Sequence, residues 1–266
     1  MTDLSLGTRP IVRYHFDGKI WQTEAADVVE ETPVTLFVNG AEYVTAAVTA
    51  IDLKDWVLGF LAGDGVISRA EDLTIFQWRP DDGQIWVRVP AFRPLPATSH
   101  YLGSCCGQSR PGFFNPTGVE PLRATHTLQI DDMRQAFGRL SDWSSLQHSG
   151  GLHAAGLARG ATLLLARADV GRHNALDKVY GAALSHPATL SQAYVVFSGR
   201  LSAEIVWKAR AMGVEAIVSN AAPTSLGIDL ADRLGITTVG FLRGDELSAF
   251  SHPERLSLPR LPRAGD

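Results

Sequence analysis

A chain of 266 residues has room for one large domain, or for a large domain with a small companion, and so for a substantial core. With 45% hydrophobic residues, 20% charged residues and a mean hydropathy of +0.02, it cannot be disordered over most of its length. A net charge of −4 argues against a general basic surface for nucleic acid or an anionic membrane. No apolar run is long enough to span a bilayer and the start lacks a signal peptide pattern, so we expect a cytoplasmic protein.

The chain contains two cysteines, and they are neighbours, Cys105 and Cys106. A trans peptide holds adjacent Cα atoms about 3.8 Å apart, whereas an unstrained disulfide needs roughly 4.4–6.8 Å. A stabilising disulfide framework is therefore excluded, and reduced thiols are consistent with the cytoplasm.

The first half of the chain predicts short strands joined by tight turns. Two hairpins are expected to turn at Asp17-Gly18 and Asn39-Gly40, dipeptides that tolerate the positive φ angles of a type I′ turn. Asp52 is expected to cap a helix. The stretch 90–121 is rich in proline, holds both cysteines and predicts a long loop. The expected elements are strands at 11–16, 20–22, 34–38, 43–48, 74–78 and 85–89 and a helix at 52–62.

The second half alternates strands with helices, which predicts a partly parallel sheet covered by helices. Gly213 and Gly235 are expected to end two of the helices in a left-handed conformation. The expected elements are strands at 152–158, 161–166, 193–197, 214–218 and 237–242 and helices at 174–184, 202–212 and 225–234. We therefore predict a β-rich N-terminal part, 1–125, with a mobile thiol loop at about 90–121, and an α/β cofactor-binding domain, 126–266.

Polar residues cluster directly after the predicted strands of the second half. Ligands of open α/β sheets bind at the carboxyl ends of strands. Glycines, hydroxyls and arginines that lead into helices provide close backbone approach, free N–H groups and positive charge, which suits a phosphate. Helix capping explains single hydroxyl residues, but it does not explain three arginines on one edge. The candidate residues are Asp169, Arg172, His173, Asn174, Lys178, Ser198, Gly199, Arg200, Ser219, Thr224 and Arg243.

Other chemistries have less support. Two adjacent cysteines do not make a zinc site, the Pro-Cys-x-x-Cys string of a zinc deaminase is missing, and so is the Gly-x-Ser-x-Gly of a serine hydrolase. We therefore expect no structural metal. His153, between Leu152 and Ala154, is typical of a half-buried histidine with satisfied polar atoms. The remaining reactive feature is the thiol pair, which lies between glycines and near Arg110; a thiol beside positive charge has a larger thiolate fraction and can carry a persulfide.

Several strings in this chain resemble one family, the formate dehydrogenase accessory sulfurtransferases, or FdhD. The resemblance covers about 31–255, and its most specific part is Asp169-Val-Gly-Arg-His-Asn-Ala-Leu-Asp-Lys178. The other strings that carry it are Val38-Asn39-Gly40, Leu58-Gly59-Phe60-Leu61, the segment 148–155, the segment 198–202, Ala222-Pro223-Thr224 and Gly240-Phe241-Leu242-Arg243.

The resemblance implies a sulfurtransferase. Such a protein takes sulfur from a cysteine desulfurase and passes it to the molybdenum bis(guanine dinucleotide) cofactor of formate dehydrogenase, with GDP or GTP as partial mimics of that cofactor. The larger domain would be similar to the cytidine deaminase fold without its zinc, within an α/β (α+β overall) protein. A homodimer would hold two guanine nucleotide moieties, and neither nucleic acid nor a membrane is an expected partner.

The resemblance also implies roles for residues. Cys106 would carry the persulfide, with Cys105 as an auxiliary thiol. Arg172, Arg200 and Arg243 would hold pyrophosphates. Phe241 would be a further cofactor-binding residue. The polar edges of the cofactor would be held by Asp169, His173, Asn174 and Lys178.

Two positions depart from the family pattern. Ser109 stands where the second loop cysteine is usual, and Ala168 stands where a glutamate is usual, which removes one charge from the expected pocket. Two rival hypotheses stay open at this point. One is a binding protein that only chaperones a molybdenum or guanine nucleotide cofactor, and the other is an enzyme that acts on a free nucleotide.

Overall fold

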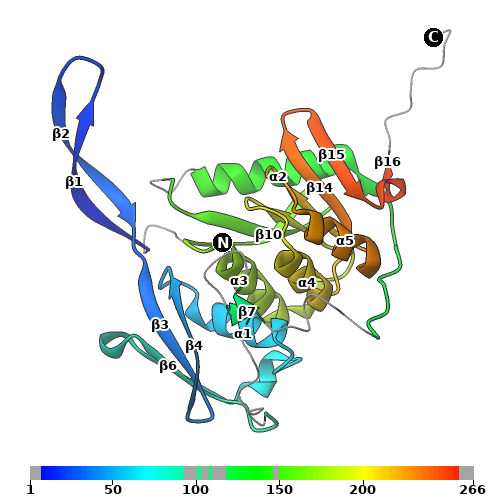
Figure 1. Cartoon of the computed structure of the whole chain (residues 1–266), viewed down its shortest axis with the longest axis horizontal. Helices are drawn as coiled ribbons and strands as arrows, with labels where there is room; N and C mark the ends of the chain where they lie inside the picture. The colour runs from blue at the N-terminus through cyan, green and yellow to red at the C-terminus, as the bar shows by residue number, and fades with distance from the viewer. Residues whose placement is uncertain (1–6, 93–100, 103–107, 110–117, 146–149, 258–266) are drawn as a thin grey trace.

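The structure is a computed structural model, and it describes residues 7–92, 101–102, 108–109, 118–145 and 150–257. A six-stranded sheet lies at its centre, with a four-stranded sheet and a protruding hairpin beside it (Figure 1). The mixed α/β class predicted from the sequence is confirmed. Within the described residues, no helix is long and apolar enough to cross a membrane.

The smaller sheet belongs to the N-terminal part and has the strand order β4-β3-β6-β5. Its buried side chains alternate along the strands, as in Val34, Leu36 and Val38, so one face of the sheet packs against the core. β3 pairs antiparallel with β4 and parallel with β6. Its strands are β3 (Thr32–Val38), β4 (Ala41–Val48), β5 (Ile75–Arg79) and β6 (Gln84–Arg88).

The larger sheet has the order β11-β10-β12-β13-β14-β15. The steps from β12 to β13 and from β13 to β14 are parallel, and the other pairings are antiparallel. The partly parallel sheet expected from the alternating elements is therefore confirmed. Its strands are β10 (His153–Arg159), β11 (Thr162–Asp169), β12 (Tyr194–Phe197), β13 (Ala216–Ser219), β14 (Thr237–Arg243) and β15 (Glu246–Ser251).

Helices cover both faces of the larger sheet (Figure 1). One apolar cluster contains residues of α2 and of one sheet face. A second cluster contains the other face, the remaining helices and the buried face of the smaller sheet, so the predicted boundary near residue 125 stays a prediction. The helices are α1 (Leu53–Gly63), α2 (Ile130–Ser145), α3 (Arg172–Ser185), α4 (Ala203–Met212) and α5 (Ser225–Leu234).

Helices α1 and α3 cross at two glycines. A Cβ atom on Gly59 would lie 1.8 Å from the carbonyl oxygen of Asp177, and one on Gly181 would lie 1.9 Å from that of Asp55. Real Cβ atoms essentially never approach so closely, so only glycine permits this crossing. The crossing ties the N-terminal part to the helix that follows β11.

Turn chemistry was predicted correctly in one hairpin and wrongly in the other. Asn39 and Gly40 have φ angles of 52° and 89°, as a type I′ turn requires. The first hairpin instead joins β1 (Thr8–Phe16) to β2 (Trp21–Val29) through four residues, 17–20. The type I′ prediction was wrong there because the Asp17 carboxylate accepts the N–H groups of Lys19 and Ile20, which closes a wider turn.

The helix predictions need two further corrections. Asp52 occupies the residue before α1, but it has a φ angle of 51° and its side chain makes no capping hydrogen bond. Its carboxylate instead lies 3.3 Å from the guanidinium of Arg167. The sequence reading also missed α2, and it missed β15 and the short parallel pair β9 (Leu128–Gln129) and β16 (Leu256–Ser257). Gly213 and Gly235 end α4 and α5 with positive φ angles, as predicted.

Candidate functional site at the strand ends

The sheet topology brings four strand ends to one edge. β11 and β12 both run antiparallel to β10, and β12, β13 and β14 are mutually parallel, so the carboxyl ends of β11 to β14 share an edge. His153, at the start of β10, joins them because it lies opposite Asp169 in the strand register. The gathering of polar residues predicted from the sequence is thus what the strand pairing produces.

Asp169 and Lys178 form an ion pair in the interior. Their Oδ2 and Nζ atoms are 2.6 Å apart, and both side chains are fully buried. Lys178 also donates to the carbonyl oxygens of Thr49 and Ala168, and Asp169 accepts the backbone N–H groups of Thr49 and Gly171. Burial lowers the pKa of Lys178, and the carboxylate opposes that shift. The pair holds the turn after β11 against the end of β4, so its direct contact with a ligand stays a prediction.

Asn174 also uses its polar atoms for hydrogen bonds within the protein. Its Nδ2 donates to the carbonyl oxygen of Ala47 and to Asp169 Oδ1, and its Oδ1 accepts the indole N–H of Trp56. Its amide therefore connects β4, α1 and the start of α3. A ligand would contact this residue only by replacing one of those partners.

Arg172 differs from these neighbours because no described residue forms an ion pair with it. It is the first residue of α3, it is 9% exposed, and its Nε and Nη2 atoms are buried without a hydrogen-bond partner among the described residues. A buried charge without a counter-charge is costly, and the first N–H groups of a helix also attract anions. Arg172 therefore provides strong attraction for an anionic group at this edge.

Two ion pairs link the starts of α3 and α4. His173 Nε2 lies 2.9 Å from Glu204 Oε2, and one turn later Asp177 pairs with Lys208. Burial lowers the pKa of His173 against the effect of Glu204, and burial raises the pKa of Asp177 to about 6 against the effect of Lys208. The two pairs fix the separation of the two helix N-termini that face the site.

His153 is a partly buried histidine close enough to Arg172 to be affected by its charge. Burial lowers its pKa, and the charges of Arg172 and His173 lower it further. A neutral imidazole can accept as well as donate a hydrogen bond. Ligand charge would raise the pKa of this histidine, because an anion near Arg172 offsets the positive charge that now opposes protonation.

The loop after β12 supplies close backbone approach. The Ser198 hydroxyl accepts the N–H of Ala154, and the buried Ser219 hydroxyl donates to the carbonyl oxygen of Gly199. A Cβ on Gly199 would lie 2.8 Å from the Phe197 ring and 3.1 Å from Arg172 Cβ, so the absence of a side chain there leaves room for Arg172. These residues shape the site through the backbone.

The remaining predicted residues lie further along the edge. Thr224 accepts the N–H of Gly227 and caps α5, so its hydroxyl has a structural role whether or not a ligand binds. Phe241 has a φ angle of 53°, is 42% exposed, and donates its N–H to the carbonyl oxygen of Ala221 in the loop after β13. Arg200 and Arg243 are exposed, and Arg243 lies at the end of β14, beside the turn to β15.

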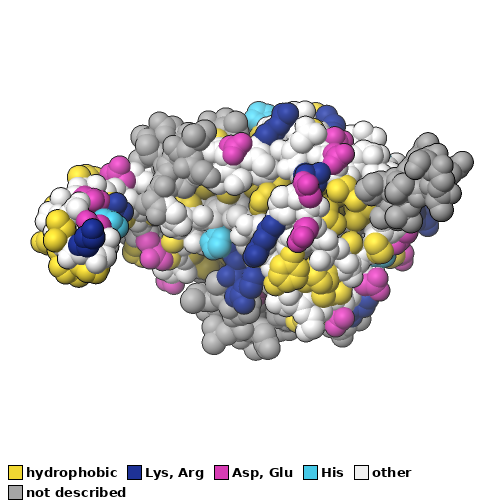
Figure 2. Space-filling view, turned by 90° about the horizontal axis from the view of Figure 1, so that it is seen from above, with side chains coloured by type: hydrophobic (Ala, Val, Ile, Leu, Met, Phe, Trp, Pro, Cys, Tyr) yellow, Lys and Arg dark blue, Asp and Glu magenta, His cyan; other side chains and the backbone are white. Residues whose placement is uncertain are grey.

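In Figure 1 the turn after β14 points upward, and Figure 2 views the molecule from that side. Lys and Arg side chains lie beside a histidine near the middle of that face. Within the described part of the chain, no group of three or more His, Cys, Asp or Glu residues is placed to hold a metal. The arrangement favours an anion held by arginine, histidine and helix N-termini.

Cys105 and Cys106 lie outside the described residues. They fall between two short strands, β7 (Tyr101–Leu102) and β8 (Gln108–Ser109), which pair with each other and which the sequence reading did not predict. Ala168 is fully buried in the apolar cluster with α2. The expectation that Ala168 removes a charge from the pocket was therefore wrong, because its side chain packs on the α2 side of the sheet.

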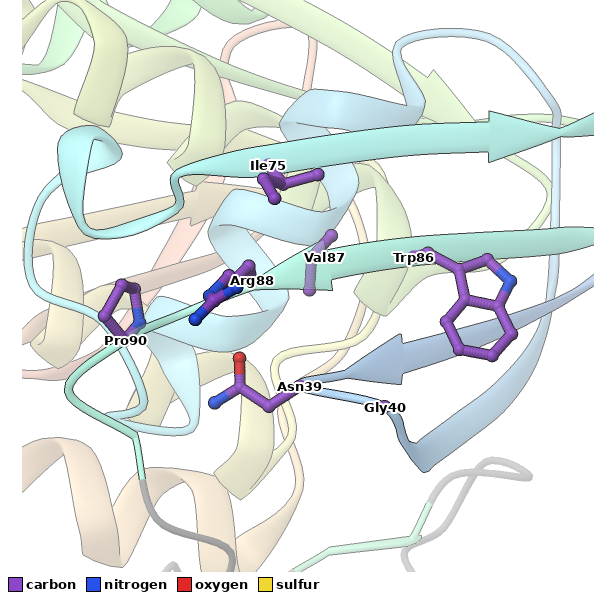
Figure 3. Close-up of a pocket in the computed structure, with 7 residues that line it drawn as sticks. All are labelled: Asn39, Gly40, Ile75, Trp86, Val87, Arg88 and Pro90. Carbon is purple, nitrogen blue, oxygen red and sulfur yellow. The ribbon is translucent and has the colours of Figure 1, made fainter.

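A separate cavity of about 510 Å³ opens on the smaller sheet (Figure 3). None of the predicted site residues lines it. Asn39, at its rim, accepts the N–H of Val89 and donates to the carbonyl oxygens of Val89 and Phe92, so this turn anchors the chain where it leaves β6. The lining residues are Asn39, Gly40, Ile75, Trp86, Val87, Arg88 and Pro90.

Sequence reasoning missed two residues of the site, Thr49 and Lys208. Thr49 carries no motif and acts through its backbone and its hydroxyl, which accepts the N–H of Val170. Lys208 does leave a signal. His173 and Asp177 are four residues apart on one helix, Glu204 and Lys208 are four apart on the other, and the charges are complementary.

Comparison with known proteins decides the family. The profile of the FdhD/NarQ family matches residues 29–257. The chain belongs to the FdhD/NarQ family. It is 38% identical over 266 residues to the sulfur carrier protein FdhD of Geobacillus kaustophilus, covering 96% of this chain and 99% of that one. It is 39% identical to the protein of the same name from Staphylococcus aureus, covering 96% and 97%.

A solved structure agrees with this FdhD/NarQ assignment. A crystal structure described as that of a formate dehydrogenase accessory protein from Desulfotalea psychrophila superposes with a TM-score of 0.77 at 27% identity. It covers 94% of this chain and 99% of that one. The fold of this FdhD/NarQ member is therefore that of the solved relative, while the finer likeness to cytidine deaminase stays a prediction.

Proposed function

We propose that this protein is a sulfur carrier that receives sulfur from a cysteine desulfurase and passes it to the molybdenum bis(guanine dinucleotide) cofactor, its substrate, for formate dehydrogenase. The names of its FdhD relatives support the carrier role. The observation that carries the binding role is Arg172, a buried cation at a helix N-terminus with two nitrogens that have no hydrogen-bond partner in the described part of the chain. Such a group fits a phosphate or pyrophosphate oxygen.

In this proposal some residues at the strand ends contact the cofactor, and others hold those residues in position. Arg172 and the first N–H groups of α3 bind a phosphate, with Arg200 and Arg243 adding exposed positive charge. His153 and His173 contribute hydrogen bonds, and a nearby anion raises the pKa of both. The supporting pair of Asp169 and Lys178 keeps the turn after β11 in position.

The thiols carry the sulfur in this proposal. The Cys106 thiolate attacks the outer sulfur of the desulfurase persulfide, the sulfur–sulfur bond of that persulfide breaks, and the desulfurase cysteine leaves as a thiolate. Cys106 then holds one additional sulfur atom, and no external oxidant or reductant is needed. Cys105 serves as an auxiliary thiol. Ser109 cannot resolve the persulfide into a disulfide within the loop.

Intact mass spectrometry tests the carrier step. The chain is incubated with a cysteine desulfurase and cysteine, and we expect a gain of one sulfur atom that is lost in Cys106→Ala and retained, at a lower level, in Cys105→Ala. Labelling of Cys106→Ala at the wild-type level would show that the roles are reversed. If both variants and the wild type gain nothing, the protein is the chaperone of a cofactor or nucleotide and not a carrier.

A thermal shift tests the nucleotide site separately. GDP at about 100 times its Kd stabilises the folded chain by about 2.7 kcal/mol, which raises the Tm by roughly 5–10 °C. Arg172→Ala should abolish most of that rise without lowering the Tm of the ligand-free protein, because the lost charge was uncompensated. Arg139→Ala, on the exposed side of α2, is the matched control. An unchanged GDP response in Arg172→Ala would contradict the assignment, and turnover of GDP or GTP would favour a nucleotide-processing enzyme.

The proposal includes a two-fold homodimer in the cytoplasm, with the cysteine desulfurase and formate dehydrogenase as partners and with neither nucleic acid nor membrane. The resemblance to the family supports these points. Light scattering at micromolar concentration measures the mass directly, and a single-chain mass with and without GDP would remove the dimer from the proposal.

A further inference from the structure

The cavity on the smaller sheet is lined by the Asn39-Gly40 turn, by residues of β5 and β6, and by Pro90 (Figure 3). Its volume of about 510 Å³ lies in the range of cavities that hold small molecules or the side chains of a peptide. None of the strand-end residues lines it. A ligand of this cavity is therefore separate from the cofactor of the proposed function.

An apolar side chain and a cation stand side by side at this cavity. Ile75 lies opposite Arg88 in the register of β5 and β6, and strand partners share a face of the sheet. Ile75 is 50% exposed, although isoleucine is usually buried. Arg88 is exposed too, and its guanidinium makes no hydrogen bond or ion pair within the part of the chain that the structure describes. The cavity thus offers an apolar wall next to a cation without a counter-charge.

The walls of the cavity are held in place without a ligand. The Trp86 ring stacks on the Phe37 ring, with centroids 4.2 Å apart and 5° between their planes, and its indole N–H donates to Gln84. The Asn39 side chain holds the turn against the chain that follows β6 through three hydrogen bonds. A site that is already formed loses little conformational entropy when a ligand fills it.

A single guanidinium beside apolar walls fits a carboxylate better than a phosphate. Phosphate sites commonly use the N-terminus of a helix, and none of the described residues that line the cavity belongs to a helix. The planar fork of a guanidinium instead matches the two oxygens of a carboxylate. Burying an apolar group of the same ligand against Ile75 and Pro90 would add a hydrophobic contribution.

We propose that this cavity binds a carboxylate carried by an apolar group, with the carboxylate on Arg88 and the apolar group against Ile75, Trp86 and Pro90. The C-terminal residue of a peptide and a free N-acylated amino acid are two sources of this chemistry. β5 is an outer strand of its sheet, and no described strand pairs with its free edge. A peptide can therefore gain backbone hydrogen bonds on that edge, which a free acid cannot.

An NMR titration of the ¹⁵N-labelled full chain with N-acetyl-leucine tests the site. We expect saturable shifts of the Trp86 indole N–H and of the Gly40 N–H, and none with the neutral N-acetyl-leucinamide at the same concentration. Arg88→Ala should weaken the binding at least tenfold, because the charged hydrogen bonds are lost. The matched control is Arg79→Ala, since Arg79 is an exposed arginine on the same face of the sheet that does not line the cavity.

Two results of this titration would overturn the proposal. One is equal binding of the acid and the amide, and the other is an equal loss of affinity in Arg88→Ala and Arg79→Ala. Ile75→Asp covers the case in which Arg88→Ala fails to fold. It places a competing carboxylate opposite Arg88 and should also weaken binding at least tenfold, so wild-type affinity in this variant would count against the site.

A second titration distinguishes the two sources of the carboxylate. Its probe is a five-residue peptide with an acetylated N-terminus and a C-terminal leucine. If the peptide also pairs with β5, it should bind at least tenfold more tightly than N-acetyl-leucine, whereas equal affinities would assign the site to free acids. Absence of saturable binding for both probes would overturn the proposal.

Discussion

Replacing Gly59 by alanine should separate α1 from α3. The new methyl group would lie 1.8 Å from the carbonyl oxygen of Asp177 and 2.8 Å from the backbone nitrogen of Gly181, and neither backbone atom can move without moving α3. Overpacking a well-packed contact typically costs about 1–3 kcal/mol, and a clash with backbone belongs at the upper end. Alanine returns about 1 kcal/mol through helix propensity, which leaves a net loss of about 2 kcal/mol.

Thermal and urea unfolding measure this loss, with a matched glycine as control. A loss of about 2 kcal/mol lowers the Tm by roughly 4–8 °C in a chain of this size. Gly138 lies inside α2 with no atom within 4 Å of its would-be Cβ, so Gly138→Ala should stabilise the protein by about 0.5–1 kcal/mol. If both variants shift stability in the same direction, the close crossing of α1 and α3 does not exist as described.

The reciprocal glycine gives a second check on the same contact. Gly181→Ala should cost a similar amount, because its Cβ would lie 1.9 Å from the carbonyl oxygen of Asp55. Once one alanine has separated the helices, the second costs less, so the double variant should lose clearly less than the sum of the two. Simple additivity would place the two glycines in independent contacts.

Three further predictions concern the site. Asp169→Asn should lower the free energy of unfolding by about 3–5 kcal/mol, measured in urea, because Lys178 would be left buried without its counter-charge; a loss below 1 kcal/mol would contradict the burial of the pair. Folding raises the pKa of Asp177 to about 6, so the folded chain binds that proton more tightly than the unfolded chain does. The free energy of unfolding should therefore fall by up to about 3 kcal/mol as the pH rises from about 4 to 6. Asp177→Asn should flatten that slope, and an unchanged slope would assign it elsewhere. Thr224→Ala should cost about 1 kcal/mol through loss of the α5 cap, with the GDP response retained; a lost response would make Thr224 a ligand contact.

Local signals explain what could be predicted of the fold. The strand runs alternate, and dipeptides such as Asn39-Gly40 are read from sequence alone because their turn depends on their own φ angles. Helix α2 was missed although Met133, Ala136, Leu140 and Trp143 are buried at helical spacing. Its apolar stripe is narrow and includes a small alanine, so the signal is weak until the sheet face that it covers is known.

The candidate site was predicted in place but not in detail. The rule that ligands bind at strand ends located the edge, because strand direction follows from the alternation of elements. The sequence could not show that Asn174 and Lys178 use their polar groups internally, since their partners, the backbone of Ala47 and Thr49, lie in the other half of the chain. It also could not show that Arg172 Nε and Nη2 have no hydrogen-bond partner among the residues that the structure describes, because that depends on how the surrounding side chains pack.

The contact between Thr49 and Asp169 has a consequence for how the site forms during folding. The two residues are 120 positions apart, so the loop between them must close before the buried carboxylate gains that N–H. That N–H is one of the two backbone groups that hold the Asp169 carboxylate in the turn before Arg172. The turn that positions Arg172 therefore takes its final shape only when the segment that carries Thr49 docks against the end of β11.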